Sequence, residues 1–517
     1  MGLIAQVITN EANNKSKISI ENMANTIKAT TKMKQTMFFR VILFSIFLPF
    51  KYLFFYVIII IELKQEDSRS IMQENIFPNQ NIKPITTNRN LSGNLEISGI
   101  DVVELAKKYK TPLYVIDEVT LVKMANDYKE AFSRYEKTKM TFASKALMTS
   151  AIAKIFHNLG FGFDVVSAGE IFTLLNAGIE LNKVSFNGNN KSIEEMSFAM
   201  DAEIDHFSVD NFYELEKLNE IAKSKNKIQK IHLRITPGIE CHTHDYIKTG
   251  QTDSKFGFDL DMLDVAIEKI LNEYKNLNLV GLHAHIGSQI FETRVYFDEA
   301  KILLEQIKRI KEKFNIELQE INLGGGLGIT YTKEDNPPTV FEIADAIIDS
   351  ILLHCKKFNL KEPTLYIEPG RSLVCSAGFT LYTLGSSKTI KELNKKYITV
   401  DGGMADNPRP SMYQAKYEAE IANAKFEENF EQVTVAGKFC ESGDILIKDI
   451  MLNDPKENDI LCVYDTGAYC YSMSSNYNCI LKPAMVLINN GESDIIVKRQ
   501  TLEQLVQNDV IPTRHKN

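Results

Sequence analysis

The chain has 517 residues, of which 44% are hydrophobic and 24% are charged, with 26 glycines and 14 prolines. This composition excludes disordered, collagen-like and small disulfide-stapled proteins, and it predicts two folded domains plus a further segment. The formal charge of −8 argues against a broad nucleic-acid-binding surface.

Residues 1–71 form an atypical leader. Within it, residues 37–61 are almost wholly apolar and long enough to span a bilayer, but two basic residues and a proline interrupt them. One of these, Lys51, would lie near the middle of the span at a cost of ~2.5–3.5 kcal/mol. A signal anchor and a targeting peptide both stay open. We favour a leader that is absent from the mature protein, which then begins near Met72.

The cysteine pattern predicts a cytoplasmic protein. The seven cysteines are scattered and include no CxxC pair, which is typical of free thiols and not of a secreted disulfide framework or a structural zinc site. If residues 37–61 were retained, the alternative is a membrane-anchored or organelle-targeted protein. Contact with a membrane is expected only in that case.

Residues 140–370 alternate between strand-like and helical patterns, within a predicted barrel domain at residues 119–372. Eight short apolar or β-branched runs end in residues such as Gly, Asn, Asp or His, with amphipathic segments between several of them. Eight such units in about 230 residues predict a (β/α)8 TIM-like barrel, a fold that typically takes ~250 residues, with a doubly wound open sheet as the alternative. The predicted strands are 140–145, 160–166, 183–188, 205–210, 230–238, 279–287, 320–326 and 364–370. The predicted helices include 193–200, 211–224, 260–274 and 296–314.

Residues 373–517 predict a C-terminal all-β domain. Short β-type runs separated by turns replace the long helical segments. These runs are 379–388, 397–403, 417–423, 432–439, 460–469 and 494–499. The N-terminal segment 72–118 carries two further strand-like runs within 94–118, and we expect it to pair with the β domain.

Chemically capable side chains gather at the ends of the predicted barrel strands, where barrel enzymes carry their active sites. A lysine can form a Schiff base with an aldehyde, and successive glycines let backbone N–H groups close on a phosphate. A carboxylate can keep a pyridine nitrogen protonated, and an imidazole can lie flat on a ring. Together these groups predict pyridoxal 5'-phosphate (PLP), an electron sink. The residues are Lys145, Asp164, Asn187–Asn189, His285, Gly324–Gly326 and Glu368–Arg371.

From about residue 94 to its C-terminus, the chain resembles the alanine-racemase-like, PLP-dependent decarboxylases. The resemblance rests on short motifs that occur in the same order, and the leader has no counterpart in them. The motifs include FASKAL (142–147), GFDVVSAGE (162–170), FNGNNKS (186–192), GLHAHIGSQ (281–289), LGGGLGI (323–329), EPGR (368–371), VDGGMADNPRP (400–410), CESGD (440–444) and GAYCYSMSSNYN (467–478). Two departures are Asp245, where the family usually has proline, and Met412, where leucine is common.

The resemblance implies how the cofactor would be held. Lys145 would be the Schiff-base lysine, Glu368 would pair with the pyridine nitrogen, and His285 would stack on the ring. The phosphate would be bound by Ser288, the three glycines, the Gly370–Arg371 backbone and Tyr469. The whole implied cofactor set is Lys145, Asp164, His285, Ser288, Gly324, Gly325, Gly326, Glu368, Gly370, Arg371 and Tyr469.

Each assignment has an ordinary structural alternative. Lys145 could be a surface lysine, although the apolar residues around it should be buried. Glu368 could pair only with the arginine three residues later, and Tyr469 could be a core tyrosine. The histidine pairs at 283–285 and 242–244 could suggest a metal, but Cys and Asp partners at ligand spacing are missing.

The resemblance also implies a substrate whose far end is itself an amino acid, meso-2,6-diaminopimelate. Its decarboxylation to L-lysine and CO2 is the last step of lysine biosynthesis. Decarboxylases of ornithine, arginine or carboxynorspermidine are the alternatives, followed by a racemase or a non-catalytic homologue. The distal carboxylate would be bound by Arg371, Arg409 and Tyr413, with Tyr469 also facing the substrate.

Glu441 would contact the distal ammonium group, and Cys440 would be the proton donor at Cα. In the family these two residues enter the neighbouring subunit's site, which implies a homodimer with shared active sites. We expect the other six cysteines to be small buried hydrophobic residues.

Overall fold

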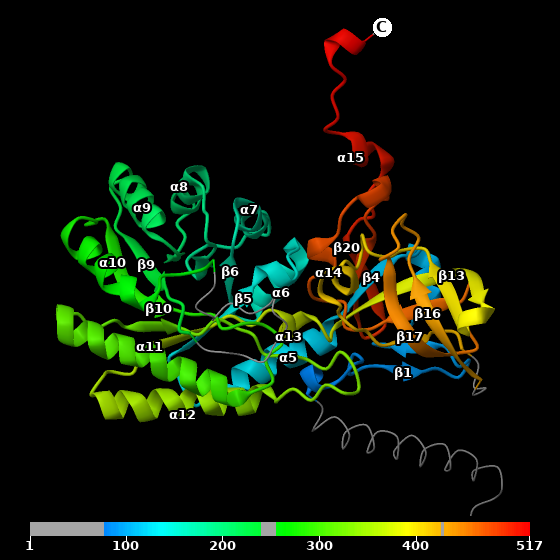
Figure 1. Ribbon diagram of the computed structural model, residues 1–517, viewed down its shortest axis with the longest axis horizontal. Helices are drawn as coiled ribbons and strands as arrows, with labels where there is room; N and C mark the ends of the chain where they lie inside the picture. The colour runs from blue at the N-terminus through cyan, green and yellow to red at the C-terminus, as the bar shows by residue number, and fades with distance from the viewer. Residues whose placement is uncertain (1–76, 239–254, 425–428, 517) are drawn as a thin grey trace, which may run out of the picture. The chain divides into compact units, whose positions relative to one another are not determined.

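The computed structural model describes residues 77–238, 255–424 and 429–516 (Figure 1). The predicted leader 1–71, its apolar segment 37–61, the 242–244 histidine pair, Cys241 and Asp245 lie outside these ranges. Within the described ranges, no helix is long and apolar enough to cross a membrane.

Eight parallel strands close into a barrel in which β12 returns to pair with β5. This closure confirms the predicted barrel and excludes the open sheet. Most residues of these strands are buried, because a parallel barrel sheet is covered on both faces. They are β5 (Thr138–Ala143), β6 (Gly162–Val165), β7 (Val184–Phe186), β8 (His206–Val209), β9 (Gln229–Arg234), β10 (Leu277–His283), β11 (Glu320–Asn322) and β12 (Thr364–Ile367).

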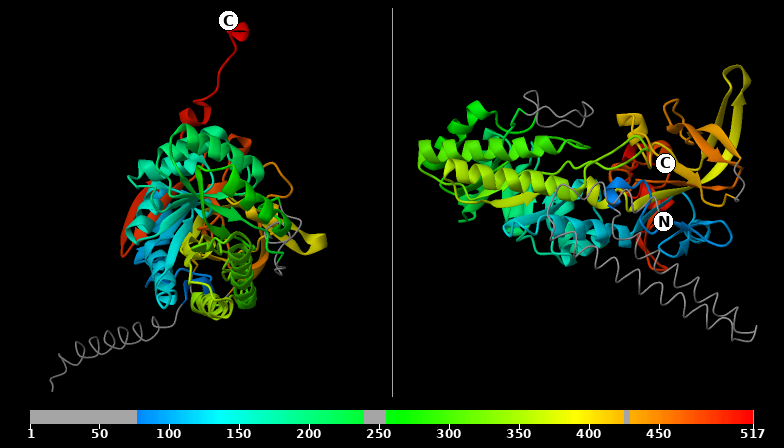
Figure 2. Two further views of the ribbon diagram at one scale, coloured as in Figure 1. Left: turned by 90° about the vertical axis from the view of Figure 1, so that its left-hand side faces the viewer. Right: turned by 90° about the horizontal axis from the view of Figure 1, so that it is seen from below.

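Amphipathic helices cover the outside of the barrel, with α7 to α9 along one side of the strands and α11 and α12 along the other (Figure 1, Figure 2). Side chains cap several N-termini, and Ser192 forms a capping box with Glu195. The four predicted helical segments correspond to α8 to α11. The helices are α5 (Glu118–Ala131), α6 (Ser150–Asn158), α7 (Ala168–Asn176), α8 (Ile193–Asp201), α9 (Phe212–Ser224), α10 (Leu260–Asn272), α11 (Thr293–Phe314) and α12 (Val340–Phe358).

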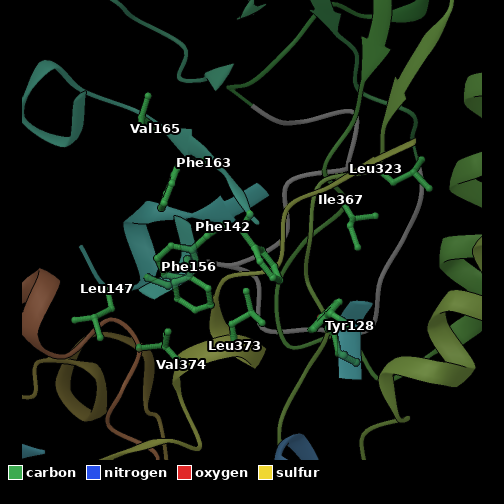
Figure 3. Packing of buried hydrophobic residues seen from close by; sticks show 14 of the residues in the cluster. Tyr128, Phe142, Leu147, Phe156, Phe163, Val165, Leu323, Ile367, Leu373 and Val374 are labelled. Atoms are coloured by element: carbon green, nitrogen blue, oxygen red, sulfur yellow. The ribbon is translucent and has the colours of Figure 1, made fainter. Parts of the chain in front are cut away.

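The barrel core consists of aromatic and branched aliphatic side chains (Figure 3). Phe142 of β5 stacks on Phe156 of α6 with ring centroids 4.2 Å apart, and Phe163 meets it edge-on. All three are buried. Phe142 lies only three residues before Lys145, so this packing fixes the end of β5 at which that lysine stands.

A mostly antiparallel sheet forms the second part of the described fold. Its strand order is β17-β16-β14-β13-β4-β19-β20, and β18 pairs with β13 and β15. Its strands are β4 (Leu113–Asp117), β13 (Gly378–Ile390), β14 (Lys395–Val400), β15 (Ala419–Ile421), β16 (Phe430–Ala436), β17 (Ile445–Asn453), β18 (Ile460–Val463), β19 (Ala484–Asn489) and β20 (Glu492–Val497). Strand β4 pairs with β13 and β19, so the segment before the barrel is part of this sheet.

The remaining elements are short. A three-stranded sheet and α4 precede β4: β1 (Asn88–Arg89), β2 (Leu95–Ile97), β3 (Ile100–Asp101) and α4 (Val102–Tyr109). Three short helices follow the barrel: α13 (Arg371–Val374), α14 (Arg409–Tyr413) and α15 (Leu502–Val506). Single 3-10 turns are η1 (Pro78–Gln80), η2 (Ser144–Ala146), η4 (Lys391–Leu393), η5 (Tyr471–Met473), η6 (Tyr477–Cys479) and η7 (Thr513–His515).

Candidate active site

The predicted barrel residues lie at one end of the barrel, where the strands terminate at their carboxyl ends. Parallel strands bring these termini to a common edge, so residues far apart in the sequence meet there. The residues are Lys145 after β5, Asp164 in β6, His285 and Ser288 after β10, Gly324–Gly326 after β11, and Glu368, Gly370 and Arg371 after β12.

Lys145 stands on a tight turn and not on a strand. The prediction that a strand runs through residue 145 was wrong, because β5 ends at Ala143 and Ser144–Ala146 forms a 3-10 turn. Ser144 and Ala146 are buried while Lys145 is exposed. The positive charge of Lys145 lowers the pKa of His285 and opposes the rise that burial causes in the pKa of Asp164, so this charge acts on groups at the barrel mouth.

The glycine loop after β11 is tightly enclosed by its neighbours. A Cβ on Gly324, where φ is +60°, would lie 2.6 Å from His285 Nδ1, and one on Gly325 would lie 2.2 Å from the Glu368 carbonyl oxygen. The Gly325 N–H donates to His285 Nδ1 at 3.3 Å. A residue with a side chain would therefore displace either the imidazole or the end of β12.

A buried polar network lies below the barrel mouth. Asn322 Nδ2 donates to Glu368 Oε1 at 2.6 Å, and Asn187 Nδ2 donates both to Asp164 and, at 3.3 Å, to Glu368 Oε1. His283 Nε2 lies 3.4 Å from Glu368 Oε2, and the other ring nitrogen of His283 is hydrogen-bonded to a serine. The network therefore gives each carboxylate at least one amide donor.

The two carboxylates differ in protonation. Burial raises the pKa of Glu368, but the charge and hydrogen bond of His283 and the amide of Asn322 outweigh it, so the pKa falls below its ordinary value. Burial and then the charge of Glu368 raise the pKa of Asp164 well above its usual range. Glu368 is thus the ionised member of the pair, able to face a protonated ring nitrogen.

The His285 imidazole is held neutral. Burial lowers its pKa well below the usual range, and the neighbouring charges of Lys145 and Arg234 lower it further. A neutral ring can accept the Gly325 N–H through Nδ1, as observed, and can lie against an aromatic ligand without placing a second cation beside Lys145.

A cluster of two arginines and two tyrosines adjoins the barrel mouth. Arg371 Nη1 donates to the Tyr331 hydroxyl at 2.5 Å, and Arg409 Nη1 donates to the same oxygen at 2.8 Å. Arg409 Nη1 also donates to the Tyr417 hydroxyl at 2.8 Å, while Arg371 Nη2 donates to Ser288 Oγ at 3.0 Å. Two buried guanidinium groups therefore share one site, which is suited to an anion.

Tyr331 and Tyr417 were not found from the sequence. Tyr331 follows the LGGGLGI motif by two residues, which is the only signal that could have identified it. Nothing in the sequence around Tyr417 distinguishes it from an ordinary core tyrosine.

Tyr469 brings the β domain to the turn that carries Lys145. Its backbone N–H donates to the Ala146 carbonyl oxygen at 2.8 Å, and Arg371 Cζ lies 4.8 Å from its ring centroid. Its φ of +62° is uncommon for a residue with a side chain, and such strain is concentrated at functional sites.

Cys440 and Glu441 stand apart from this cluster. Both are exposed in the turn between β16 and β17, where Cys440 N–H donates to Asn478 Oδ1 and the Tyr477 hydroxyl donates to Glu441. Among the described residues, neither they nor the half-buried Tyr413 form a hydrogen bond or ion pair with the barrel mouth.

The other described cysteines depart from prediction at one position. Cys355, Cys375, Cys462 and Cys470 are buried as expected, but Cys479 is exposed. It ends a surface turn with φ of +56°, so its side chain projects away from the core.

The donor set fits PLP. The mouth combines an accessible lysine amine, an ionised buried carboxylate, a neutral imidazole and a loop that admits only glycine at its closest approaches. These are the groups needed to bind an aldehyde, a pyridine nitrogen, an aromatic face and a phosphate.

Comparison with known proteins identifies the family. The model for the pyridoxal-binding domain of pyridoxal-dependent decarboxylases matches residues 119–375. Diaminopimelate decarboxylase of Bacillus subtilis is 45% identical over 428 residues, covering 82% of this chain and 97% of the relative. The crystal structure of the Methanocaldococcus jannaschii diaminopimelate decarboxylase in complex with L-lysine superposes with a TM-score of 0.79 at 36% identity, covering 85% of this chain and all of that one. An L-lysine complex of the Helicobacter pylori enzyme gives 0.71 at 31%, covering 78% and 98%. The chain therefore belongs to the diaminopimelate decarboxylases, a family of pyridoxal-dependent decarboxylases.

Proposed function

We propose that this chain decarboxylates meso-2,6-diaminopimelate to L-lysine and CO2. The observation that carries the proposal is the buried pair Arg371 and Arg409 beside the mouth that holds Lys145 and Glu368. When bound, PLP supplies a protonated ring that takes up the electron pair left at Cα by the departing CO2.

The barrel residues hold the cofactor. Lys145 Nζ would be its covalent anchor, Glu368 would keep a proton at the ring nitrogen, and His285 would pack against the ring. Asp164 supports Glu368 through the shared amide of Asn187. The phosphate is bound by Gly324–Gly326, Ser288, the backbone of Gly370 and Arg371, and Tyr469.

The arginine pair selects the substrate by its distal carboxylate, because a planar guanidinium fork binds carboxylate in two places. Tyr413, on the same short helix α14 as Arg409, and Tyr469, whose ring centroid lies 4.8 Å from Arg371 Cζ, belong to the proposed substrate-binding set. Glu441 binds the distal ammonium group, which ornithine shares but without the neighbouring carboxylate. Cys440 donates the proton to Cα after CO2 has left.

We further propose a homodimer with shared sites. Its support is the exposed position of Cys440 and Glu441, whose own hydrogen bonds stay within residues 439–478. A second copy can bring this turn to the barrel mouth of the first. The free, unpaired state of the described cysteines supports a cytoplasmic enzyme.

The test is CO2 release from meso-diaminopimelate beside ornithine, arginine and carboxynorspermidine, with the purified holoenzyme. We expect kcat/KM to be highest for diaminopimelate. A higher kcat/KM for any of the other three amino acids would identify that compound as the substrate and contradict the proposal. A colourless protein that PLP does not turn yellow and that releases no CO2 would identify a non-catalytic homologue.

A further inference from the structure

Tyr331 is the common acceptor of two cations. Its side chain is 7% exposed, and its hydroxyl oxygen accepts hydrogen bonds from Nη1 of Arg371 and from Nη1 of Arg409. Both guanidinium groups also lie near its ring face, with Arg409 Cζ 5.0 Å and Arg371 Cζ 5.7 Å from the centroid. The phenol thus offsets the repulsion between two buried like charges through its oxygen and its π-system.

The Tyr331 hydroxyl donates one hydrogen bond and accepts two. Its hydroxyl lies 3.1 Å from Cys375 Sγ, and that thiol donates to the Asp465 carbonyl oxygen at 3.0 Å. Burial raises the pKa of Tyr331 above its usual range and that of Cys375 to about 11, so both keep their protons. The phenol therefore donates to sulfur, and its two lone pairs are left for the two arginines.

These contacts decide which guanidinium edges remain for a ligand. Tyr331 and Tyr417 both accept hydrogen bonds from Nη1 of Arg409. Among the described residues, none accepts a hydrogen bond from Nε or Nη2 of this arginine. Nε and Nη2 form the side of the fork that binds a carboxylate through two parallel bonds. The structure thus presents this edge of Arg409 beside Arg371.

We propose that Tyr331 is a specificity-determining positioning residue, which sets the Arg371–Arg409 pair to read the carboxylate at the far end of the substrate. This inference rests on the proposed function, because it takes the arginines as the distal-carboxylate site. It assigns to Tyr331 the discrimination between ligands that end in an amino acid and ligands that end in a bare amine.

The experiment compares L-lysine with cadaverine, which has the same carbon chain and two amines but no carboxylate. Both are titrated as competitors of diaminopimelate with wild-type holoenzyme and with Tyr331→Phe, which keeps the ring and removes the shared acceptor. We expect L-lysine to bind roughly 10- to 100-fold more weakly to the variant and cadaverine to change less than about twofold. KM for diaminopimelate should rise more than kcat falls, with the cofactor absorption unchanged.

Tyr135→Phe is the matched control. Tyr135 is also buried, and its hydroxyl donates to the Pro363 carbonyl oxygen at 2.6 Å, away from the arginine pair. The control should leave the ratio of the two inhibition constants unchanged.

An equal loss of L-lysine and cadaverine binding in Tyr331→Phe would overturn the inference while leaving the proposed function intact. If wild-type enzyme releases no CO2 from diaminopimelate, the proposed function itself fails. If Tyr331→Phe gives no folded holoenzyme, Tyr417→Phe carries the test, since it removes one of the two acceptors of Arg409 Nη1 and none of Arg371. A selective loss of L-lysine then supports the inference, and an equal loss rejects it.

Discussion

Arg371 and Arg409 reach the same phenol oxygen from different parts of the fold. Arg371 opens α13 directly after barrel strand β12, whereas Arg409 opens α14, which follows strand β14 of the β domain. Their Nη1 atoms lie 2.5 Å and 2.8 Å from the Tyr331 hydroxyl. The distal pocket is therefore complete only when the barrel and the sheet are both folded.

Arg409→Lys should reduce kcat/KM for diaminopimelate by roughly 30- to 1,000-fold, because lysine keeps the charge but loses the fork, at a cost of ~2–4 kcal/mol. The yellow absorption of bound PLP should persist, since Arg409 contacts Tyr331 and Tyr417 and not the barrel mouth. Steady-state kinetics and an absorption spectrum check both points. Arg294→Lys, at a 71% exposed side chain, is the control. Loss of the cofactor in Arg409→Lys would contradict the assignment.

Lys145→Ala should abolish turnover and the cofactor absorption together, because no methyl group can replace a nucleophilic amine. Lys139→Ala is the matched control. It removes an exposed lysine near the opposite end of the same strand, β5, and should leave both readouts close to wild type. Decarboxylation by Lys145→Ala at near the wild-type rate would remove this lysine from the site.

Mixed dimers test the shared sites. Lys145→Ala and Glu441→Ala chains should each be inactive, and subunit exchange should restore one intact site per heterodimer, about a quarter of all sites in a statistical mixture. CO2 release from differently tagged, co-purified chains measures the recovery.

The control for this exchange is Lys145→Ala mixed with Arg409→Lys. Arg409 contacts Tyr331 of its own chain, so Lys145 and Arg409 of one chain contribute to the same site. Each site of this heterodimer therefore carries one of the two changes, and no activity beyond that of the Arg409→Lys chain should return. Heterodimers of the first pair that stay inactive would mean that each site is built from a single chain.

His232 should make the protein less stable in mild acid. It is fully buried, and burial followed by the charge of His206 lowers its pKa from 6.5 to about 4. The unfolded chain takes up a proton as pH falls through 6.5, whereas the folded chain does so only near 4. The free energy of unfolding therefore decreases in this window, by up to roughly 3 kcal/mol at its acid end.

His232→Gln should remove this loss while keeping a donor toward Glu320, which accepts from His232 Nε2 at 2.8 Å. Denaturant unfolding of both proteins between pH ~7.5 and ~5 measures the effect. The lowered pKa of Glu320 acts in the same direction, but only at more acid pH. Equal pH slopes for the two proteins would reject the role of His232.

The barrel and its glycine loop could be predicted because they depend on local patterns. Short apolar or β-branched runs mark most of β5 to β12, although β9 and β11 also carry charged residues. Three successive glycines mark a close backbone approach whichever residues surround them. The turn at Lys145 was missed because apolar residues on both sides of it continue the strand pattern. The exposure of Cys479 was missed for a similar reason, because it depends on the backbone conformation of a turn that the sequence pattern does not reveal.

The acceptors of the arginine pair could not be predicted. Tyr331 and Tyr417 lie 86 residues apart in the sequence, and each meets Arg409 only through tertiary packing. Asn187 was noticed at the end of its strand, but its role in joining Asp164 and Glu368 depends on closure of the barrel, which brings the end of β12 close to β6 and β7 with β5 between them.

The place of β4 in the sheet has a consequence for synthesis on the ribosome. Its neighbours β13 and β19 follow the whole barrel, and about 370 residues separate Leu113 from its partner Ala484. At ~5–20 residues per second, β4 waits roughly 20–70 s for its second neighbour, while the barrel strands emerge in the order in which they pair. We therefore expect the barrel to close first, with a strand of five buried residues left unpaired during elongation and in need of protection from other chains.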